Sequence, residues 1–324
     1  MPIRLAAILG FAAATLAAAD PAMLRLLPPD AAVMAGMDAV RMKNSPFGQR
    51  LVGQTGADSA SLDQLIRMTG FDPRRDVNEV LFATPSGVDL ETLASPGGGS
   101  AAAGRVLFIA RGQFDIARLG EAARSQSGFV ESYHGVTVIG SKQDDESRMA
   151  FLSGSIALAG DAESVRAAID RHRSGAAPDP ALAARIQDVS TRYDFWFLTN
   201  ESPALTLAPR VPNKTLSGAF RGDLFQAVRR MQIGVKAGAL MEISVEAVTR
   251  SEKDAVALGD VIRFMSQVLE GNSGAHVSEL LQKMDLRTEG ATLRFSIAVP
   301  PAYVDQLFDP QSGRGRSRGV RVVQ

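Results

Sequence analysis

Five charged residues lie within eight consecutive positions of the stretch TGFDPRRDVNEVLFATP, which runs from Thr69 to Pro85. They are Asp72, Arg74, Arg75, Asp76 and Glu79. Carboxylates held close together could transfer protons to and from a substrate, so this cluster is a candidate for acid–base catalysis. Against that reading, Gly70 is a typical residue to end a helix, Pro73 cannot continue one, and an apolar run follows. We therefore interpret the cluster as an exposed turn between a helix and a strand, where opposite charges pair weakly, by about 0–1 kcal/mol each.

The remaining residues that could do chemistry do not form a recognised motif. The histidines, His134, His172 and His276, are far apart in the chain, and there is no cysteine. A zinc site needs several such ligands at a defined spacing, so we expect no metal site and no cofactor. The stretch GNSGA, at 271–275, misses the nucleophile motif Gly-x-Ser-x-Gly at its last position. The sequence therefore points to no catalytic residue, although a hydrolase with a site assembled from distant residues leaves no such signature.

The N-terminus has the pattern of a signal peptide. Arg4 precedes an uncharged apolar stretch from Leu5 to Leu16, and the small residues Ala17-Ala18-Ala19 follow it. We expect cleavage after Ala19, which makes 1–19 a signal peptide and the mature chain periplasmic or secreted. The alternative is an uncleaved anchor at the membrane interface. The apolar stretch is shorter than the roughly 20 residues that cross a bilayer, and no later segment is long enough, so we expect no transmembrane span.

Charge and composition exclude further classes. The chain of 324 residues carries 35 basic and 35 acidic side chains, whereas a nucleic-acid binder would show a basic excess. With no cysteine it forms no disulfide, although an exported chain of this length buries enough core to fold without one. We therefore expect no nucleic-acid partner, and composition leaves the oligomeric state open.

The C-terminal stretch DPQSGRGRSRGVRVVQ differs from the rest of the chain, since it mixes arginine with glycine and serine. Such a segment buries too little apolar surface to order itself, and we predict a disordered tail over 309–324. Its charge makes it a candidate contact for an anionic surface, while a solvated tail without a role is the alternative. The four residues of this candidate contact are Arg314, Arg316, Arg318 and Arg321.

Capping and turn residues divide the chain into short helices and strands. The apolar run 31–40 predicts a strand, and Ser45 followed by proline predicts the start of a helix. Hairpins are expected to turn at His134-Gly135 and near Gly154. A further helix is expected to begin after Asp161 and to stop at Gly175.

The order of these patterns repeats after a short linker at 176–182. The strand YDFWFLTN, at 193–200, corresponds to the first strand. After it come a strand followed by a helix, and then a closing unit of strands and a short helix, in the same order as before the linker. The strand at 193–200 is apolar on both faces, so we expect it to be a central strand with Trp196 in the core. We predict an α+β fold of tandem-duplicated antiparallel sheets flanked by helices, with modules at 20–175 and 183–308.

The signal peptide, the strand LLPPDAAVMAGMDA and the helix end TGFDPRRD together resemble a loose group of exported bacterial proteins of unknown function. That resemblance covers most of the mature chain and implies a fold and a compartment. For function, the sequence favours an exported, non-enzymatic protein of the cell envelope that binds a protein partner or a small apolar ligand. An exported hydrolase is the alternative.

Overall fold

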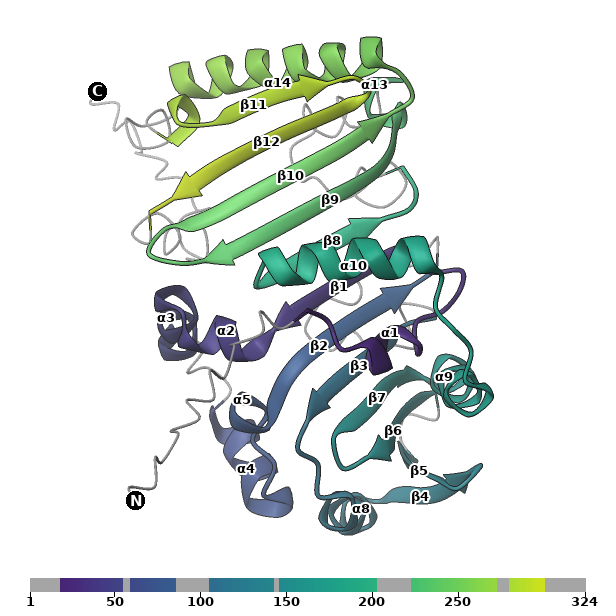
Figure 1. Cartoon of the computed structure of the whole chain (residues 1–324). Coiled ribbons are helices and arrows are strands. Elements are labelled where there is room, and N and C mark those ends of the chain that lie inside the picture. The colour runs from purple at the N-terminus through teal and green to yellow at the C-terminus, as the bar shows by residue number, and fades with distance from the viewer. Residues whose placement is uncertain are drawn as a thin grey trace, which may run out of the picture.

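The computed structural model describes residues 18–54, 59–85, 105–142, 146–202, 223–272 and 280–300 (Figure 1). Side chains are described in these ranges apart from 51–54, 59–61, 223–224 and 268–272. The part of the chain described contains helices and one twelve-stranded antiparallel sheet, so the α+β class predicted from the sequence is confirmed.

The sheet has the strand order β11-β12-β10-β9-β8-β1-β2-β3-β7-β6-β5-β4, and every neighbouring pair is antiparallel. The strands are β1 (Val33–Asp38), β2 (Val77–Thr84), β3 (Leu107–Gly112), β4 (Gly128–Tyr133), β5 (Val136–Ser141), β6 (Ser147–Ser153), β7 (Ile156–Asp161), β8 (Phe195–Thr199), β9 (Val228–Ala237), β10 (Met241–Thr249), β11 (Asp285–Glu289) and β12 (Thr292–Val299).

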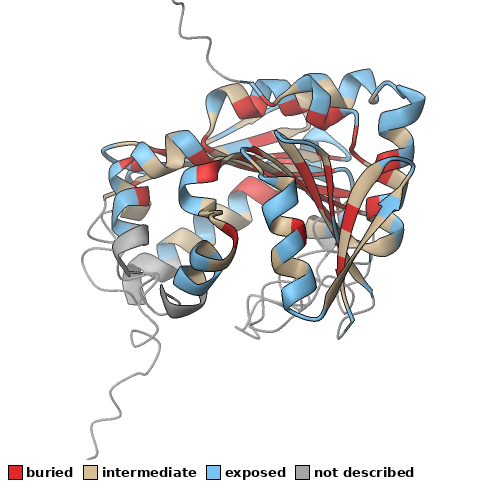
Figure 2. Ribbon diagram, turned by 90° about the horizontal axis from the view of Figure 1, so that it is seen from below, coloured by how far each residue is buried: buried red, intermediate tan, exposed pale blue. Residues whose placement is uncertain are grey.

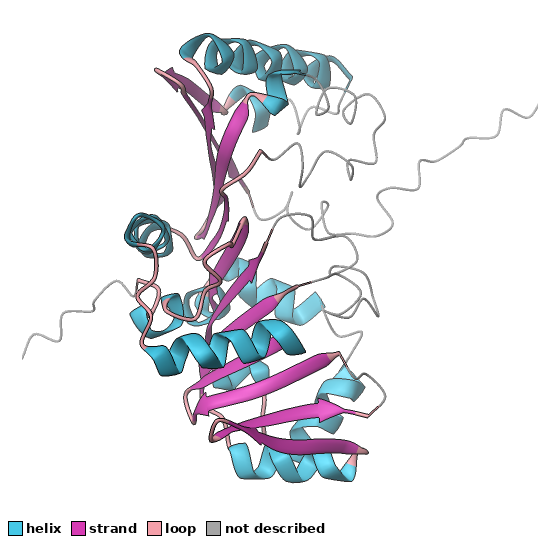
Figure 3. Cartoon of the chain, turned by 90° about the vertical axis from the view of Figure 1, so that its right-hand side faces the viewer, coloured by secondary structure: helices cyan, strands magenta, loops and turns pink. Residues whose placement is uncertain are grey.

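Helices pack on both faces of this sheet, which Figure 3 shows nearly edge-on. The helices are α1 (Pro21–Leu24), α2 (Ala39–Asn44), α3 (Pro46–Gln54), α4 (Ser59–Thr69), α5 (Pro73–Asp76), α8 (Ile116–Ser125), α9 (Ala162–Ser174), α10 (Pro180–Arg192), α13 (Asp223–Gln226) and α14 (Glu252–Asn272). We call the face that carries α1, α9 and α10 the α10 face, and the face that carries α8 and α14 the α14 face. No helix in the described ranges is long and apolar enough to cross a membrane.

Counted outward from the centre of the sheet, the first five strands of each half follow the same order, and the first half continues with β5 and β4. The first half runs β1, β2, β3 and then its last strand, β7, before β6; the second runs β8, β9, β10 and then its last strand, β12, before β11. In each half a helix, α8 or α14, follows the third strand. The halves meet where β1 pairs with β8, so the segments 20–175 and 183–308 contribute to one continuous sheet. Within the predicted linker 176–182, α10 begins at Pro180.

The main core lies on the α10 face of the first half and of the central strands. It joins Met34, Leu81 and Leu158 of the sheet to Ile169 of α9 and Ile186 of α10, and all five side chains are buried. Figure 2 shows buried residues concentrated in the strands and on the helix sides that face them. At about 25 cal/mol per Å² of apolar area, such burial is the main favourable term in folding.

Trp196 also belongs to this core, as predicted, with 2% of its surface exposed. Its ring lies over Gly36 of β1, where a Cβ atom would come within 2.3 Å of the indole. The missing side chain of Gly36 is therefore what lets the large ring lie flat against the sheet.

The described chain begins inside the fold. Ala19 is buried, and its backbone N–H donates to Ser190 Oγ on α10 at 2.8 Å. Asp20 then caps α1 by accepting from the N–H of Ala22 at 2.8 Å. The junction at which signal-peptide cleavage is expected is thus packed against the main core.

Predictions that depend on local turn chemistry are confirmed. Ser45 accepts from the N–H of Gly48 at 2.9 Å at the start of α3, and Asp161 accepts from Ser164 at 2.9 Å at the start of α9. Gly175 ends α9 in a left-handed conformation, with φ 64°. The predicted hairpins are β4–β5, which turns at His134-Gly135, and β6–β7, which turns beside Gly154.

Two predictions are wrong in detail. The strand expected over 31–40 ends at Asp38, because the Asp38 carboxylate accepts from the N–H of Arg41 at 2.8 Å and starts α2. The charged cluster is not wholly exposed: Glu79 is 7% exposed and faces the α10 side of β2. Asp76 is buried as well and pairs with Arg75, so the expected exposed pair is formed by Asp72, the N-cap of α5, with Arg74.

Candidate functional site

A shallow groove lies on the α10 face of the second half, between α10 and the strands β9, β10, β12 and β11. In Figure 1 these strands are uncovered beside α10, whereas α14 packs on their other face. The groove has two adjoining parts, of about 270 Å³ towards β11 and about 580 Å³ along α10. We call it the α10 groove.

The groove owes its polar floor to the alternation of residues along the strands. Strand pairing sets Gln232, Glu246 and Arg294 side by side on one face, and Ser244 opposite Ser296 on the same face. The residues between them point to the α14 face, where Leu286 and Leu293 pack against Leu258 and Ile262 of α14. A strand with one buried face carries polar residues at every second position, so the period of two puts these polar side chains in the groove.

The end of α10 and the residue after it form the wall of the groove. The ring of Tyr193 lies on β9 at Gly234, where a Cβ atom would come within 2.4 Å of the ring. The guanidinium of Arg192 stacks 5.2 Å from the centre of that ring and pairs with Asp188 one turn earlier. The rigid ring and the sheet thus position Arg192 at the rim of the groove.

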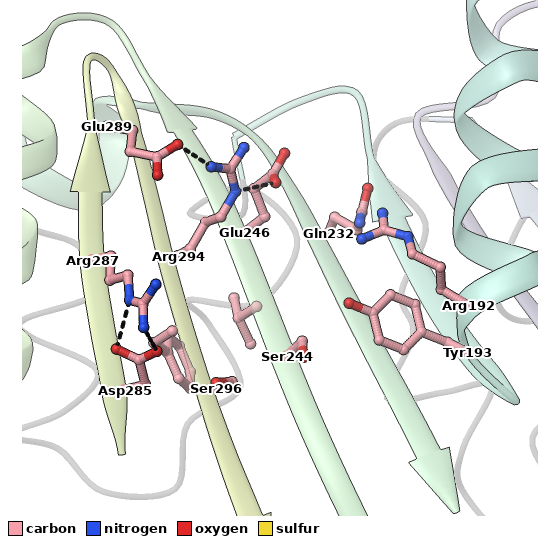
Figure 4. A pocket seen from close by; sticks show the side chains of 12 residues that line it. Arg192, Tyr193, Gln232, Ser244, Glu246, Asp285, Arg287, Glu289, Arg294 and Ser296 are labelled. Atoms are coloured by element: carbon pink, nitrogen blue, oxygen red, sulfur yellow. Dashed lines mark hydrogen bonds and ion pairs between the residues drawn. The ribbon is translucent and has the colours of Figure 1, made fainter.

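Ion pairs cross the floor of the groove, as Figure 4 shows. Arg294 bridges two carboxylates, with Nε 2.8 Å from Glu246 and Nη1 2.5 Å from Glu289. Asp285 and Arg287 form a second pair at 2.8 Å on the edge strand. The hydrogen bonds that Arg294 donates to Glu246 and Glu289, together with the charges of these carboxylates, raise the pKa of Arg294 above its ordinary value.

This arrangement suits recognition better than proton transfer. A general base must offer an oxygen to the substrate, and a nucleophile needs a base within hydrogen-bond reach. Glu246, Glu289 and Asp285 instead each accept from a guanidinium. Such pairs present fixed donors and acceptors to a partner.

A second group of charges lies in an enclosed space beneath α10, lined by Asp38, Arg41, Glu79 and Arg111 among others. Glu79 accepts from Arg111 at 3.1 Å, and Arg41 contacts Asp38 at 2.8 Å. Burial raises the pKa of Glu79, and the bond from Arg111 opposes that rise without cancelling it. The enclosed volume is only about 10 Å³, so we read this group as structural.

A third depression, of about 560 Å³, lies on the α14 face of the first half. Phe108, Ile139 and Met149 line it, and glycine and alanine form much of its floor. Arg148 stands at its rim, 4.9 Å from the ring of Phe129. This is the place in the described structure that best fits a small apolar ligand.

The residues singled out from the sequence that the structure describes do not line the α10 groove. Arg314, Arg316, Arg318 and Arg321 lie outside the described residues. His134 is at the β4–β5 turn, 3.6 Å from Asp170. Within the ranges that the structure describes, no group of three or more histidine or acidic side chains could hold a metal ion.

The groove residues were missed, although the sequence carries a signal for them. LRTEGATLRFSIAV and MEISVEAV alternate polar and apolar residues at a period of two. That period predicts a strand with one polar face. It does not say which strands lie side by side, and the groove exists only once β9, β10, β12 and β11 are neighbours.

No family model matches this chain, and no curated protein sequence matches it. Among solved structures, it is similar to one described as crystal form I of TP0453, with a TM-score of 0.50. The identity is 10%, and the match covers 88% of this chain and 94% of that one. At such low identity the likeness shows a similar α+β fold alone.

Proposed function

We propose that this chain is an exported, non-enzymatic protein of the cell envelope and that it binds a protein partner through the α10 groove. The observation that carries the proposal is the uncovered, charged α10 face of β9, β10, β12 and β11. The compartment rests on the signal-peptide pattern that ends at Ala19.

The comparison between the halves supports the groove as a binding surface. In the first half, α9 covers the α10 face and packs Val165, Ala168 and Ile169 onto an apolar sheet. In the second half, the same face carries Gln232 and Arg294 instead, and apart from α10 no helix in the described ranges covers it. If the shared strand order reflects a tandem duplication, the second half has exchanged an apolar helix contact for a polar surface.

The shape and chemistry of the groove favour a macromolecule. Small-molecule sites are concave and largely apolar, whereas this groove is shallow and lined by ion pairs. Four strands spaced about 4.8 Å apart and about 25 Å long present roughly 500 Å². With the flank of α10, that area approaches the roughly 800 Å² that each partner contributes to a standard protein interface.

A small apolar ligand is the second candidate, favoured by the depression beside Phe108 and Met149. Met149 is 43% exposed there, so its apolar side chain is available for contact with such a ligand. The exported hydrolase stays the alternative reading, and its site would have to use groups other than the paired carboxylates of the α10 groove.

Photocrosslinking in intact cells tests the proposal. A photoreactive residue at Ser244, on the groove floor, should give one discrete protein adduct. The same residue at Val256, exposed on α14, is the matched control and should not give that adduct. Equal adducts from both positions, or an adduct from Val256 alone, would contradict the groove as the docking surface.

A further inference from the structure

Four guanidinium groups gather in the part of the α10 groove that runs along α10. They belong to Arg185 and Arg192 of α10, Arg230 of β9 and Arg294 of β12. The carboxylates that line the same part are Asp188 and Glu246. Four positive and two negative side chains leave this end of the groove with a net charge of +2.

Both carboxylates already form ion pairs within the protein. Asp188 pairs with Arg192, and Glu246 pairs with Arg294 at 2.8 Å. Arg185 donates to the neutral amide of Asn200 at 2.7 Å, and it forms no ion pair with a residue in the described ranges. Arg230 has no hydrogen bond or ion pair with any residue that the structure describes. Two guanidiniums from different elements therefore face the groove without a carboxylate partner among the residues that the structure describes.

This arrangement carries an electrostatic cost in the free protein. Arg185 is half-buried, and burial together with the nearby charge of Arg230 lowers the pKa of Arg185, although the charge of Glu246 opposes that shift. Like charges in a partly desolvated place repel one another, and a bound anion would offset that repulsion. An arginine pair with free donors also matches the planar geometry of an oxyanion.

We infer that Arg185 and Arg230 form an anion site that receives carboxylates from an acidic segment of the protein partner, an inference that rests on the proposed function. Carboxylates fit better than phosphates here, since Asp188 and Glu246 line the same space and would repel a dianion more strongly. The occupant is therefore a stretch rich in aspartate or glutamate, seated along α10 with its acidic side chains towards β9.

Binding of a fluorescent hexaglutamate peptide to the full chain tests this inference. The wild type should bind the peptide at low salt and release it as salt screens the charges. Arg185→Gln and Arg230→Gln should each weaken binding by about tenfold or more, as expected for loss of a charge-assisted hydrogen bond. Arg173→Gln, at the exposed end of α9, makes the same change in charge away from the groove and should leave binding unchanged.

Three outcomes would overturn the inference: no peptide binding, equal loss in all three variants, or displacement of the peptide by equimolar inorganic phosphate. Arg230 is exposed, so Arg230→Gln should stay folded even if Arg185→Gln does not. If the peptide does not bind while a photoreactive residue at Ser244 still crosslinks to a protein, the anion site is wrong and the proposed function stands. If both fail, the groove is not the binding surface.

Discussion

Glu79 shows how one buried side chain ties several segments of the chain together. It lies on β2, accepts from Arg111 of β3 at 3.1 Å and receives the backbone N–H of Asp20. Burial nevertheless raises its pKa above the ordinary value, because the charged form loses more hydration than these bonds return. The protein should therefore show a stability that depends on the protonation of this carboxyl.

Glu79→Gln should change the pH dependence of unfolding. Because the folded pKa lies above the unfolded one, the folded state binds the proton more tightly between the two values. The wild-type free energy of unfolding therefore falls as pH rises through that window, from the ordinary glutamate pKa upwards. The variant has no proton to lose, so its stability relative to wild type should rise across the same window.

Chemical denaturation at a series of pH values measures this difference, with Glu121→Gln on the exposed side of α8 as the control for the change in charge. A difference between Glu79→Gln and wild type that stays constant with pH would show that the carboxyl does not titrate with a raised pKa.

Ser190 offers a test of whether Ala19 contributes to the stability of the fold. Its hydroxyl accepts from the backbone of Ala19 at 2.8 Å, in a buried place. Ser190→Ala should therefore lower the free energy of unfolding by about 1 kcal/mol in a chain that retains Ala19. It should have less effect on a chain that begins at Asp20, as expected after cleavage at the predicted site. Equal losses in the two forms would show that this bond contributes nothing.

At the scale of elements, α14 is the helix that covers one face of the second half. Its buried Leu258 packs with Leu293 of β12 and with Ile262 one turn later. Phe264, on the same helix, is 65% exposed. The helix thus offers a buried and an exposed apolar side chain for comparison.

Leu258→Ala should lower the free energy of unfolding by about 2–5 kcal/mol, because it leaves a cavity between helix and sheet. Phe264→Ala is the control and should change it by about 0.5 kcal/mol or less. Thermal and urea unfolding measure both. A loss for Phe264→Ala as large as that for Leu258→Ala would mean that α14 packs through the opposite side.

The elements also show what the sequence can and cannot predict. Caps such as Ser45, Asp161 and Gly175 act on neighbours three or four residues away, so the pattern of residue types predicts them. The burial of Glu79 and the existence of the α10 groove depend on which strands pair across the sheet. Those pairings join residues far apart in sequence, and no local pattern specifies them. The end of the first strand at Asp38 was missed for a simpler reason. Apolar residues stand on both sides of this aspartate, so the residue pattern predicts that the apolar run continues through it, although Asp38 ends the strand and caps a helix.

At the scale of the whole molecule, two halves whose first five strands have the same order form one sheet, but the α10 face of that sheet differs between them. The first half covers that face with α9 and builds the core there, while the second leaves a charged groove beside α10. Arg185 and Arg192 are positioned on α10 by Asn200 and by the ring of Tyr193 before any partner arrives, which lowers the entropy cost of binding. The first half thus supplies stability, and the second supplies the surface proposed to bind.

Native mass spectrometry of the chain, purified without denaturation from an envelope fraction, tests this account most directly. The wild type should carry the additional mass of a protein partner, and Ser244→Trp, which fills the groove floor, should lose it. An added mass of a few hundred daltons that persists in Ser244→Trp would instead indicate a small ligand bound elsewhere and would contradict the α10 groove as the binding surface.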